Sequence, residues 1–172
     1  DYVRMCSDNA AYVRHGLYIN GMIIAETERK EEKDMDFRPE KKLGFGLMRL
    51  PQNDPADAAD IDIEQVKKMV DLFMEKGFTY FDTAWMYNGF ASEDCAKEVL
   101  TSRYDRSSYT LATKLHAGFF NSREDMDNVF ARQLEKTGAG YFDYYLLHGI
   151  EAAMLPKYEE FDAFGWLLDK KA

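Results

Sequence analysis

The sequence predicts an α/β fold in which parallel strands alternate with helices. Four apolar stretches of strand length alternate with four stretches whose apolar residues recur at helical spacing. The segments between successive strands are long enough to hold a helix, as parallel neighbouring strands require. Ionisable residues also stand at the ends of three strands at nearly equal spacing, since Asp82, Lys114 and His148 are 32 and 34 residues apart.

The expected elements follow one another from residue 35 onward. We expect strands at Leu43–Leu50, Thr79–Ala84, Tyr109–Leu115 and Tyr141–Leu147. We expect helices beginning after Asp62, after Ser92, after Ser122 and near Lys157, the last one running to the end of the chain. Asp62 and Gln65 resemble a capping box, and Ser92 is interpreted as an N-cap that precedes the acidic Glu93 and Asp94.

Composition narrows the class of protein. The chain of 172 residues, 46% hydrophobic, is long enough to bury the core of one ordinary domain. A net charge of −9 argues against nucleic-acid binding, which needs a basic surface. The two cysteines, Cys6 and Cys95, are far apart and suggest neither a zinc site nor a disulfide framework. No transmembrane run or signal peptide is apparent, so we predict a cytoplasmic protein without membrane contact.

Residues 1–34 are predicted to be an N-terminal extension or linker, and residues 35–172 the functional part. Short strands or a hairpin around Gly16 are expected at Ala11–Val13 and Leu17–Ile19. The mixed charge run Glu26–Asp34 has no apolar anchors and is interpreted as a solvated linker or a frayed helix. Met35 is a candidate original start of the protein.

Asp82 sets the chemical question, because a carboxylate at the end of a buried strand is costly unless it is paired. Taken singly, each candidate has an ordinary structural explanation. Asp82 could cap a helix or join a loop salt bridge, and Lys114 could form a plain ion pair. His148 could be a core histidine, and Tyr87 is one of 11 tyrosines.

Taken together, the four groups suggest proton delivery to a carbonyl. On neighbouring strands Asp82 and Lys114 would neutralise each other, and an ammonium beside the Tyr87 hydroxyl favours loss of the phenolic proton. Such a phenol can donate a proton to a carbonyl oxygen, and His148 could orient that oxygen. The set has no activated nucleophile and no metal cage, so the remaining reagent would be a hydride from a nicotinamide.

From Met35 onward, the chain resembles the first half of an aldo-keto reductase. The resemblance rests on Leu43-Gly44-Phe45-Gly46, on Phe81-Asp82-Thr83-Ala84 with Tyr87, on Leu111-Ala112-Thr113-Lys114, and on Tyr141-Phe142-Asp143-Tyr144-Tyr145-Leu146-Leu147-His148. It implies a (β/α)8 TIM-barrel fold, incomplete here, with about four βα units. It also implies reduction of a small aldehyde or ketone with NADPH, NADH being the other candidate cofactor.

The resemblance assigns the roles of the site residues. Tyr87 is expected to be the general acid, Lys114 to tune it, Asp82 to hold Lys114, and His148 to orient the substrate carbonyl. The segment after the first strand is expected to line the nicotinamide, together with Asp82. That segment consists of Gly46, Leu47 and Met48.

The chain also departs from the family pattern. Asn88 follows Tyr87 where many relatives have Gly, and Phe90 and Ala91 precede the Ser-Glu pair. A complete barrel needs about 250 residues, and the family binds the adenosine phosphates with its second half. An iron–sulfur cluster, as in some similar bacterial reductases with a C-terminal ferredoxin-like domain, could belong only to a region absent from this chain.

These departures leave alternatives open. We expect the truncated chain to show little or no NADPH-linked reduction on its own, and we expect the outer edges of its first and last strands to be open for self-association. One alternative is a non-catalytic cofactor-sensing or interaction module built on an aldo-keto-type half-barrel. Another is a (β/α)8 isomerase or lyase with a lysine base, which would need a phosphate site in the absent half.

Overall fold

The structure is a computed structural model that describes residues 12–13, 16–19, 22–24 and 41–171. The chain forms two compact units, and each is described here by itself. The larger unit comprises Asp36–Lys114 and Asn128–Tyr145. The smaller unit comprises Asp1–Met35, Leu115–Asp127 and Leu146–Ala172.

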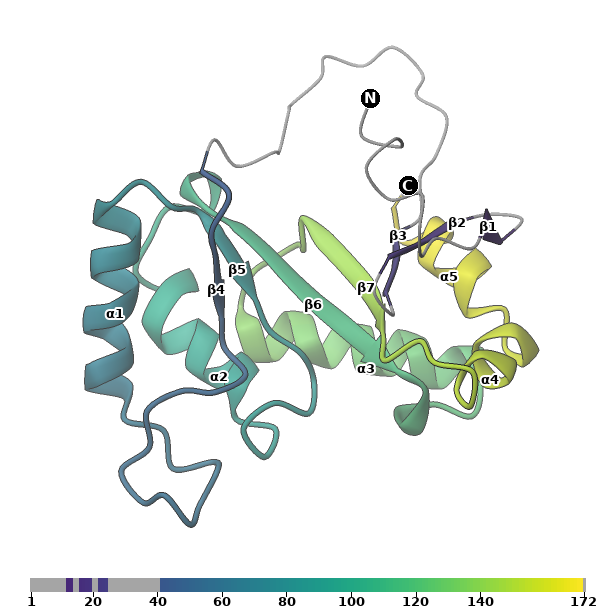
Figure 1. The fold of residues 1–172 in the computed structure, drawn as a ribbon, viewed down its shortest axis with the longest axis horizontal. Coiled ribbons are helices and arrows are strands. Elements are labelled where there is room, and N and C mark those ends of the chain that lie inside the picture. Colours follow the sequence, from purple (N-terminus) through teal and green to yellow (C-terminus); the bar gives the residue numbers. More distant parts are fainter. Residues whose placement is uncertain (1–11, 14–15, 20–21, 25–40, 172) are drawn as a thin grey trace. The chain divides into compact units, whose positions relative to one another are not determined.

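Figure 1 labels the strands and α-helices in chain order. The strands are β1 (Tyr12–Val13), β2 (Gly16–Ile19), β3 (Met22–Ile24), β4 (Gly44–Gly46), β5 (Tyr80–Asp82), β6 (Thr110–His116) and β7 (Tyr144–His148). The α-helices are α1 (Ile63–Glu75), α2 (Ser92–Ala96), α3 (Arg123–Thr137), α4 (Leu155–Glu160) and α5 (Ala163–Asp169). A π-helical turn (Lys97–Thr101) continues α2, and 3-10 turns lie at Arg106–Ser108 and Ala117–Phe119. Within the described residues, no helix is long and apolar enough to cross a membrane.

The larger unit contains the predicted parallel sheet. Strands β4, β5 and β6 pair in parallel, with Phe45 opposite Phe81 and Phe81 opposite Leu111. Strand β7 lies next to β6, and the four parallel strands alternate with helices in the order that the sequence predicts. The α/β fold class is therefore confirmed.

Helix α1 shows how the sequence sets both its ends and its buried face. The Asp62 carboxylate accepts a hydrogen bond from the Gln65 N–H at 2.9 Å, which confirms the predicted cap. Val66 and Val70 are fully buried one turn apart, and the Phe73 ring lies 5.2 Å from that of Phe81 on β5. These contacts pack α1 against β5 and so form part of the core of the larger unit.

The first expected strand is shorter than predicted. Only Gly44–Gly46 form β4, and the chain then turns instead of continuing to Leu50. The backbone carbonyl of Leu47 accepts hydrogen bonds from the side chains of Asn88 at 2.6 Å and Ser92 at 2.9 Å. Side-chain donors thus take the place of a neighbouring strand, and regular pairing ends there.

The predicted N-cap of the second helix was wrong. Ala91 occupies the N-cap position of α2, and Ser92 lies inside the helix with its side chain buried. Besides bonding Leu47, the Ser92 hydroxyl lies 2.8 Å from that of Thr83. Tertiary partners have therefore taken the hydroxyl that would otherwise cap the helix.

In the smaller unit, the N-terminal strands form an antiparallel meander. The hairpin expected around Gly16 is present, with Val13 opposite Gly16, although Gly16 begins β2. Strand β3 was not predicted, and it pairs with β7 at Ile23 and Leu147. The expectation of an open outer edge on the last strand was therefore wrong at this position. The Glu26–Asp34 linker and Met35 lie outside the described residues, and the boundary between residues 34 and 35 stays a prediction.

The last predicted helix is two helices. Asp162 separates α4 from α5, because its backbone is left-handed, with φ of 48°. The Asp162 carboxylate then accepts a hydrogen bond from the Gly165 N–H at 3.2 Å and caps α5. The apolar spacing across this junction predicts a single helix, whereas one residue in a left-handed conformation divides it.

Candidate functional site

The carboxyl ends of β5 and β6 bring two predicted site residues together. Asp82 is the last residue of β5 and lies opposite Ala112 in the parallel register. Lys114 lies two residues beyond Ala112 on β6, so the side chains of Ala112 and Lys114 project from the same face of that strand. The register therefore allows the Lys114 side chain to reach Asp82.

Lys114 and Asp82 form a largely buried ion pair. The Lys114 Nζ donates hydrogen bonds to Asp82 Oδ1 at 2.6 Å and to the Thr83 carbonyl at 2.8 Å. The side chain of Lys114 is 5% exposed and that of Asp82 is 29% exposed. An ammonium at this depth needs such partners, and this pairing supplies the partner that the sequence led us to expect for Asp82.

Tyr87 stands in the turn after β5, against the same ammonium. The Lys114 Nζ lies 4.8 Å from the centroid of the Tyr87 ring, so the cation faces the π-system of the phenol. The turn itself is held by Asn88, whose backbone is left-handed, with φ of 50°, and whose amide binds the Leu47 carbonyl. Asp82, Lys114 and Tyr87 are thus assembled in one place within the larger unit.

In the segment predicted to line a nicotinamide, Gly46 and Met48 are exposed, and the backbone of Leu47 between them is held by hydrogen bonds. A Cβ added at Gly46 would meet no atom within 4 Å, and Met48 is 49% exposed. Leu47 between them is fully buried, and its N–H donates to the Asp82 carbonyl at 2.8 Å. Backbone without a side chain beside an exposed thioether leaves room for a flat ring at this segment.

His148 belongs to the smaller unit and ends β7 there. Its ring packs edge-to-face on that of His116, with the centroids 5.6 Å apart. The His116 Nδ1 accepts a hydrogen bond from the Gly118 N–H at 2.9 Å, and burial lowers the pKa of the His116 imidazole below its ordinary value. His116 was not a predicted candidate, although its position two residues after Lys114 on the same strand was a usable signal.

A buried phenol joins the ends of β6 and β7 in the smaller unit. The Tyr158 hydroxyl lies 2.7 Å from the His148 carbonyl and 3.1 Å from the Leu115 carbonyl, and it accepts a hydrogen bond from the Ala117 N–H at 2.9 Å. Burial raises the pKa of Tyr158 to about 12, so the hydroxyl keeps its proton for the two carbonyls. The backbone beside His148 is therefore fixed by a single side chain of α4.

We expect Tyr158→Phe to lower the free energy of unfolding by about 1–3 kcal/mol, because it leaves buried backbone groups without partners. The Ala117 amide should also exchange its hydrogen faster, since it loses its acceptor. Urea denaturation and amide hydrogen exchange measure the two effects. Tyr141→Phe, at a residue that is 48% exposed, is the matched control and should change neither. Unchanged exchange at Ala117 in Tyr158→Phe would contradict the bridging role.

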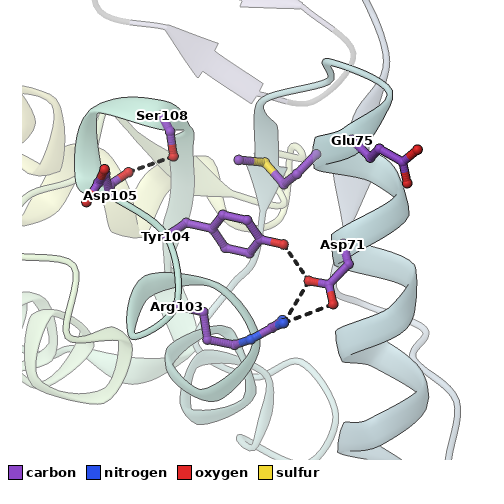
Figure 2. Close-up of a pocket in the computed structure, with 7 residues that line it drawn as sticks. Asp71, Glu75, Arg103, Tyr104, Asp105 and Ser108 are labelled. Atoms are coloured by element: carbon purple, nitrogen blue, oxygen red, sulfur yellow. Dashed lines mark hydrogen bonds and ion pairs between the residues drawn. The ribbon is translucent and has the colours of Figure 1, made fainter.

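A hollow of about 560 Å³ lies on the larger unit beside α1 (Figure 2). Its lining residues are Asp71, Met74, Glu75, Arg103, Tyr104, Asp105 and Ser108. Arg103 Nη2 lies 2.8 Å and 2.9 Å from the two Asp71 oxygens, and Tyr104 also donates to Asp71. Hydrogen bonds from Arg103 and then Tyr104 hold the pKa of Asp71 below its ordinary value. Ser108 precedes the start of β6, so this hollow is at the end of the strand opposite Lys114 and we assign it a structural role.

Comparisons with known proteins agree on one family. Residues 42–162 match the model described as "Aldo/keto reductase family". Norsolorinic acid reductase B of Dothistroma septosporum is 26% identical over 119 residues, which cover 62% of this chain and 30% of that protein.

Two solved structures align with part of the chain, and the first of them shares its fold. PA4992 from Pseudomonas aeruginosa, described as an aldo-keto reductase, aligns with a TM-score of 0.60 at 20% identity, over 74% of this chain and 50% of that one. An aldo-keto reductase from Klebsiella pneumoniae, crystallised with NADPH, aligns with a TM-score of 0.49 at 21% identity, over 68% of this chain and 41% of that one. The chain thus spans half or less of the length of each of these relatives.

Proposed function

Because the chain belongs to the aldo/keto reductase family, we propose that it carries the proton-delivery half of a site that reduces an aldehyde or ketone with NADPH. The observation that supports this most directly is the assembly of Asp82, Lys114 and Tyr87 at the carboxyl ends of β5 and β6. This is the edge at which barrels of this class place their chemistry.

In the proposed reaction, Tyr87 is the general acid. A hydride added to the carbonyl carbon leaves a developing alkoxide, and the Tyr87 hydroxyl donates its proton to that oxygen. The Lys114 ammonium, 4.8 Å from the ring centroid, stabilises the phenolate that forms, until solvent returns a proton to it. Asp82 keeps Lys114 oriented through the 2.6 Å hydrogen bond. His148 is proposed to orient the carbonyl oxygen, as the family resemblance implies.

NADPH supplies the hydride when it is bound. Gly46, Leu47, Met48 and Asp82 are proposed to hold its nicotinamide end, because Gly46 leaves the backbone open and Met48 offers an exposed apolar side chain. In the family, the second half of the barrel holds the adenosine phosphates. The proposed contribution of this chain is therefore confined to the nicotinamide end and the proton donor.

A hydride donor without an adenosine group tests this proposal on the 172-residue chain itself. 1-Benzyl-1,4-dihydronicotinamide carries the reactive ring alone, so it needs only the part of the site that this chain is proposed to contain. We expect the purified chain to accelerate reduction of an activated aromatic aldehyde by this donor over buffer. NADPH should give no further gain, because its phosphates find no partner. Loss of donor absorbance and formation of the alcohol measure the rate.

The outcomes separate the alternatives. Acceleration by the chain supports the proton-delivery site, and turnover with NADPH alone at the rate of a complete reductase would contradict the proposed division of the site. A chain that accelerates neither reaction would count against the enzyme. Saturable NADPH binding in that inactive chain would instead favour the cofactor-sensing module.

A further inference from the structure

A second carboxylate, that of Glu93, lies behind the ion pair. Glu93 is the second residue of α2, and its acidity there was expected to serve the helix N-terminus. Instead the residue is 0% exposed, as are Thr113 on β6 and Gln133 on α3. Thr113 is the residue before Lys114, so its side chain projects to the opposite face of the strand from the ion pair.

The hydrogen bonds of Glu93 are confined to one of its two oxygens. Oε1 accepts from the Thr113 hydroxyl at 2.8 Å and from the Gln133 amide at 2.7 Å. Oε2 is buried and has no hydrogen-bond partner among the residues that the structure describes. Two donors on one oxygen match a carbonyl group, and they leave the other oxygen as the one that carries a proton.

Among the residues that the structure describes, no cationic side chain bonds to Glu93. Lys136 on α3 donates instead to Asp94, 2.5 Å away, and to the Phe90 carbonyl, and Lys114 binds Asp82 and Thr83. The Tyr145 hydroxyl donates to the Gln133 side chain, which in turn donates to Glu93. Burial raises the pKa of the Glu93 carboxyl, and the bonds from Thr113 and Gln133 oppose this only in part. An ionised carboxylate with one unpaired oxygen would be costly here.

Gln133 connects this carboxyl to the backbone of Lys114. Its side-chain oxygen accepts from the Tyr145 hydroxyl at 2.5 Å, which fixes which end of the amide donates. The amide nitrogen then lies 2.7 Å from Glu93, 3.0 Å from the Thr113 hydroxyl and 3.2 Å from the Lys114 carbonyl. The end of β6 is thus held from α2 and α3 at the residue that carries the ammonium.

We propose that Glu93 is a positioning residue, kept as a neutral acid, which fixes the end of β6 and so the place of Lys114. It acts from the face of the sheet opposite Asp82, through Thr113 and Gln133. Its importance for catalysis rests on the proposed function, whereas its protonation and its hold on Lys114 can be measured without turnover. A neutral acid here also means that, among the described residues, Asp82 is the carboxylate that balances Lys114.

The protonation gives a pH dependence with a definite sign. The folded-state pKa of Glu93 lies above its value in the unfolded chain, about 4.3. Its contribution to stability is therefore complete below the unfolded value and is lost as the pH rises through the raised folded value. Glu93→Gln keeps the neutral shape and should remove this loss on the alkaline side.

The test combines infrared and NMR spectroscopy of the 172-residue chain. We expect the carbonyl stretching band of a protonated carboxyl at neutral pH, absent in Glu93→Gln and retained in Glu98→Gln, a matched change at an exposed glutamate. Glu93→Ala should shift the ε-methylene signals of Lys114, which Lys114→Met identifies, whereas Glu93→Gln should leave them in place. Thr113→Val removes one donor with little change of shape and should give the same shift if Glu93→Ala fails to fold.

Two results would overturn the proposal. A Glu93 carboxyl that is ionised at neutral pH would exclude the neutral acid. Lys114 signals that stay unchanged in both Glu93→Ala and Thr113→Val would exclude the positioning role. Neither result touches the assignment of Tyr87 as proton donor, which the dihydronicotinamide assay tests separately.

Discussion

Asp82→Asn is expected to lower the free energy of unfolding by about 2–4 kcal/mol, because it leaves a buried ammonium without its counter-charge. Lys114 is 4% exposed, and after the change its Nζ would keep the Thr83 carbonyl as a partner but lose the carboxylate. An uncompensated charge at that depth is among the few causes of a large single-residue effect.

The reverse change should cost less. Lys114→Met leaves Asp82 alone, and the side chain of Asp82 is 29% exposed, so water can solvate the carboxylate. The double variant should be more stable than Asp82→Asn, because removing the lysine also removes the charge that lacked a partner. Urea denaturation of the four chains, followed by circular dichroism, completes the cycle.

A surface pair provides the control for this cycle. Glu64 and Lys67 lie three residues apart on α1 at 2.8 Å, and the Glu64 side chain is 76% exposed. Glu64→Gln should leave the denaturation midpoint unchanged, because a solvated pair contributes little. Two results would contradict this explanation. Either Asp82→Asn would destabilise the chain as little as Glu64→Gln does, or Lys114→Met would destabilise it more than Asp82→Asn does. In either case the unpaired buried ammonium would not determine the stability of this site.

The parallel sheet and the Asp82–Lys114 pair could be predicted because both follow from spacing. Apolar stretches of strand length and helices of period 3.6 identify the βα units, and nearly equal intervals then place ionisable residues at the same edge of neighbouring strands. The register that places Asp82 opposite Ala112 is the physical basis of that inference. Reasoning of this kind needs only the order of the elements.

The burial of Ser92 and Glu93 could not be predicted in the same way. Ser92 and Glu93 match the local pattern of a solvated helix start, and that pattern contains no information on what packs against it. In the fold, the carbonyl of Leu47, just after β4 and 45 residues before Ser92, accepts from Ser92. The hydroxyl of Thr113 on β6, 20 residues after Glu93, donates to Glu93. Tertiary partners thus outweigh the local rule, and the result is a carboxyl in the interior.

Two further differences have the same origin. Apolar spacing across Asp162 predicts one helix. The left-handed backbone of Asp162 cannot be predicted from that spacing, because glycine is the residue that usually signals this conformation. Strand β3 has only three residues, which is too short for a periodic pattern, and it is held by pairing with β2 and with the distant β7. Elements that depend on a distant partner are the ones that sequence patterns miss.

Tyr87→Phe is expected to lower the chain-dependent rate of aldehyde reduction by about 100-fold to 10,000-fold, as loss of a general acid does. The substitution keeps the ring over which the Lys114 ammonium lies at 4.8 Å and removes only the proton that the developing alkoxide needs. Stability should therefore change little. Reduction by 1-benzyl-1,4-dihydronicotinamide, measured on the purified variant, gives the rate.

Tyr141→Phe is the matched control, since it removes a phenolic hydroxyl from an exposed residue and should retain the full rate. If the Tyr87→Phe chain kept its rate, another group would have to be the proton donor. Lys114 would then have a structural role. Because the ion pair and the ring contact survive in that variant, a lost rate with unchanged stability would assign the proton to the Tyr87 hydroxyl itself. Comparison with Asp82→Asn, which should lose both rate and stability, separates donation of the proton from assembly of the site.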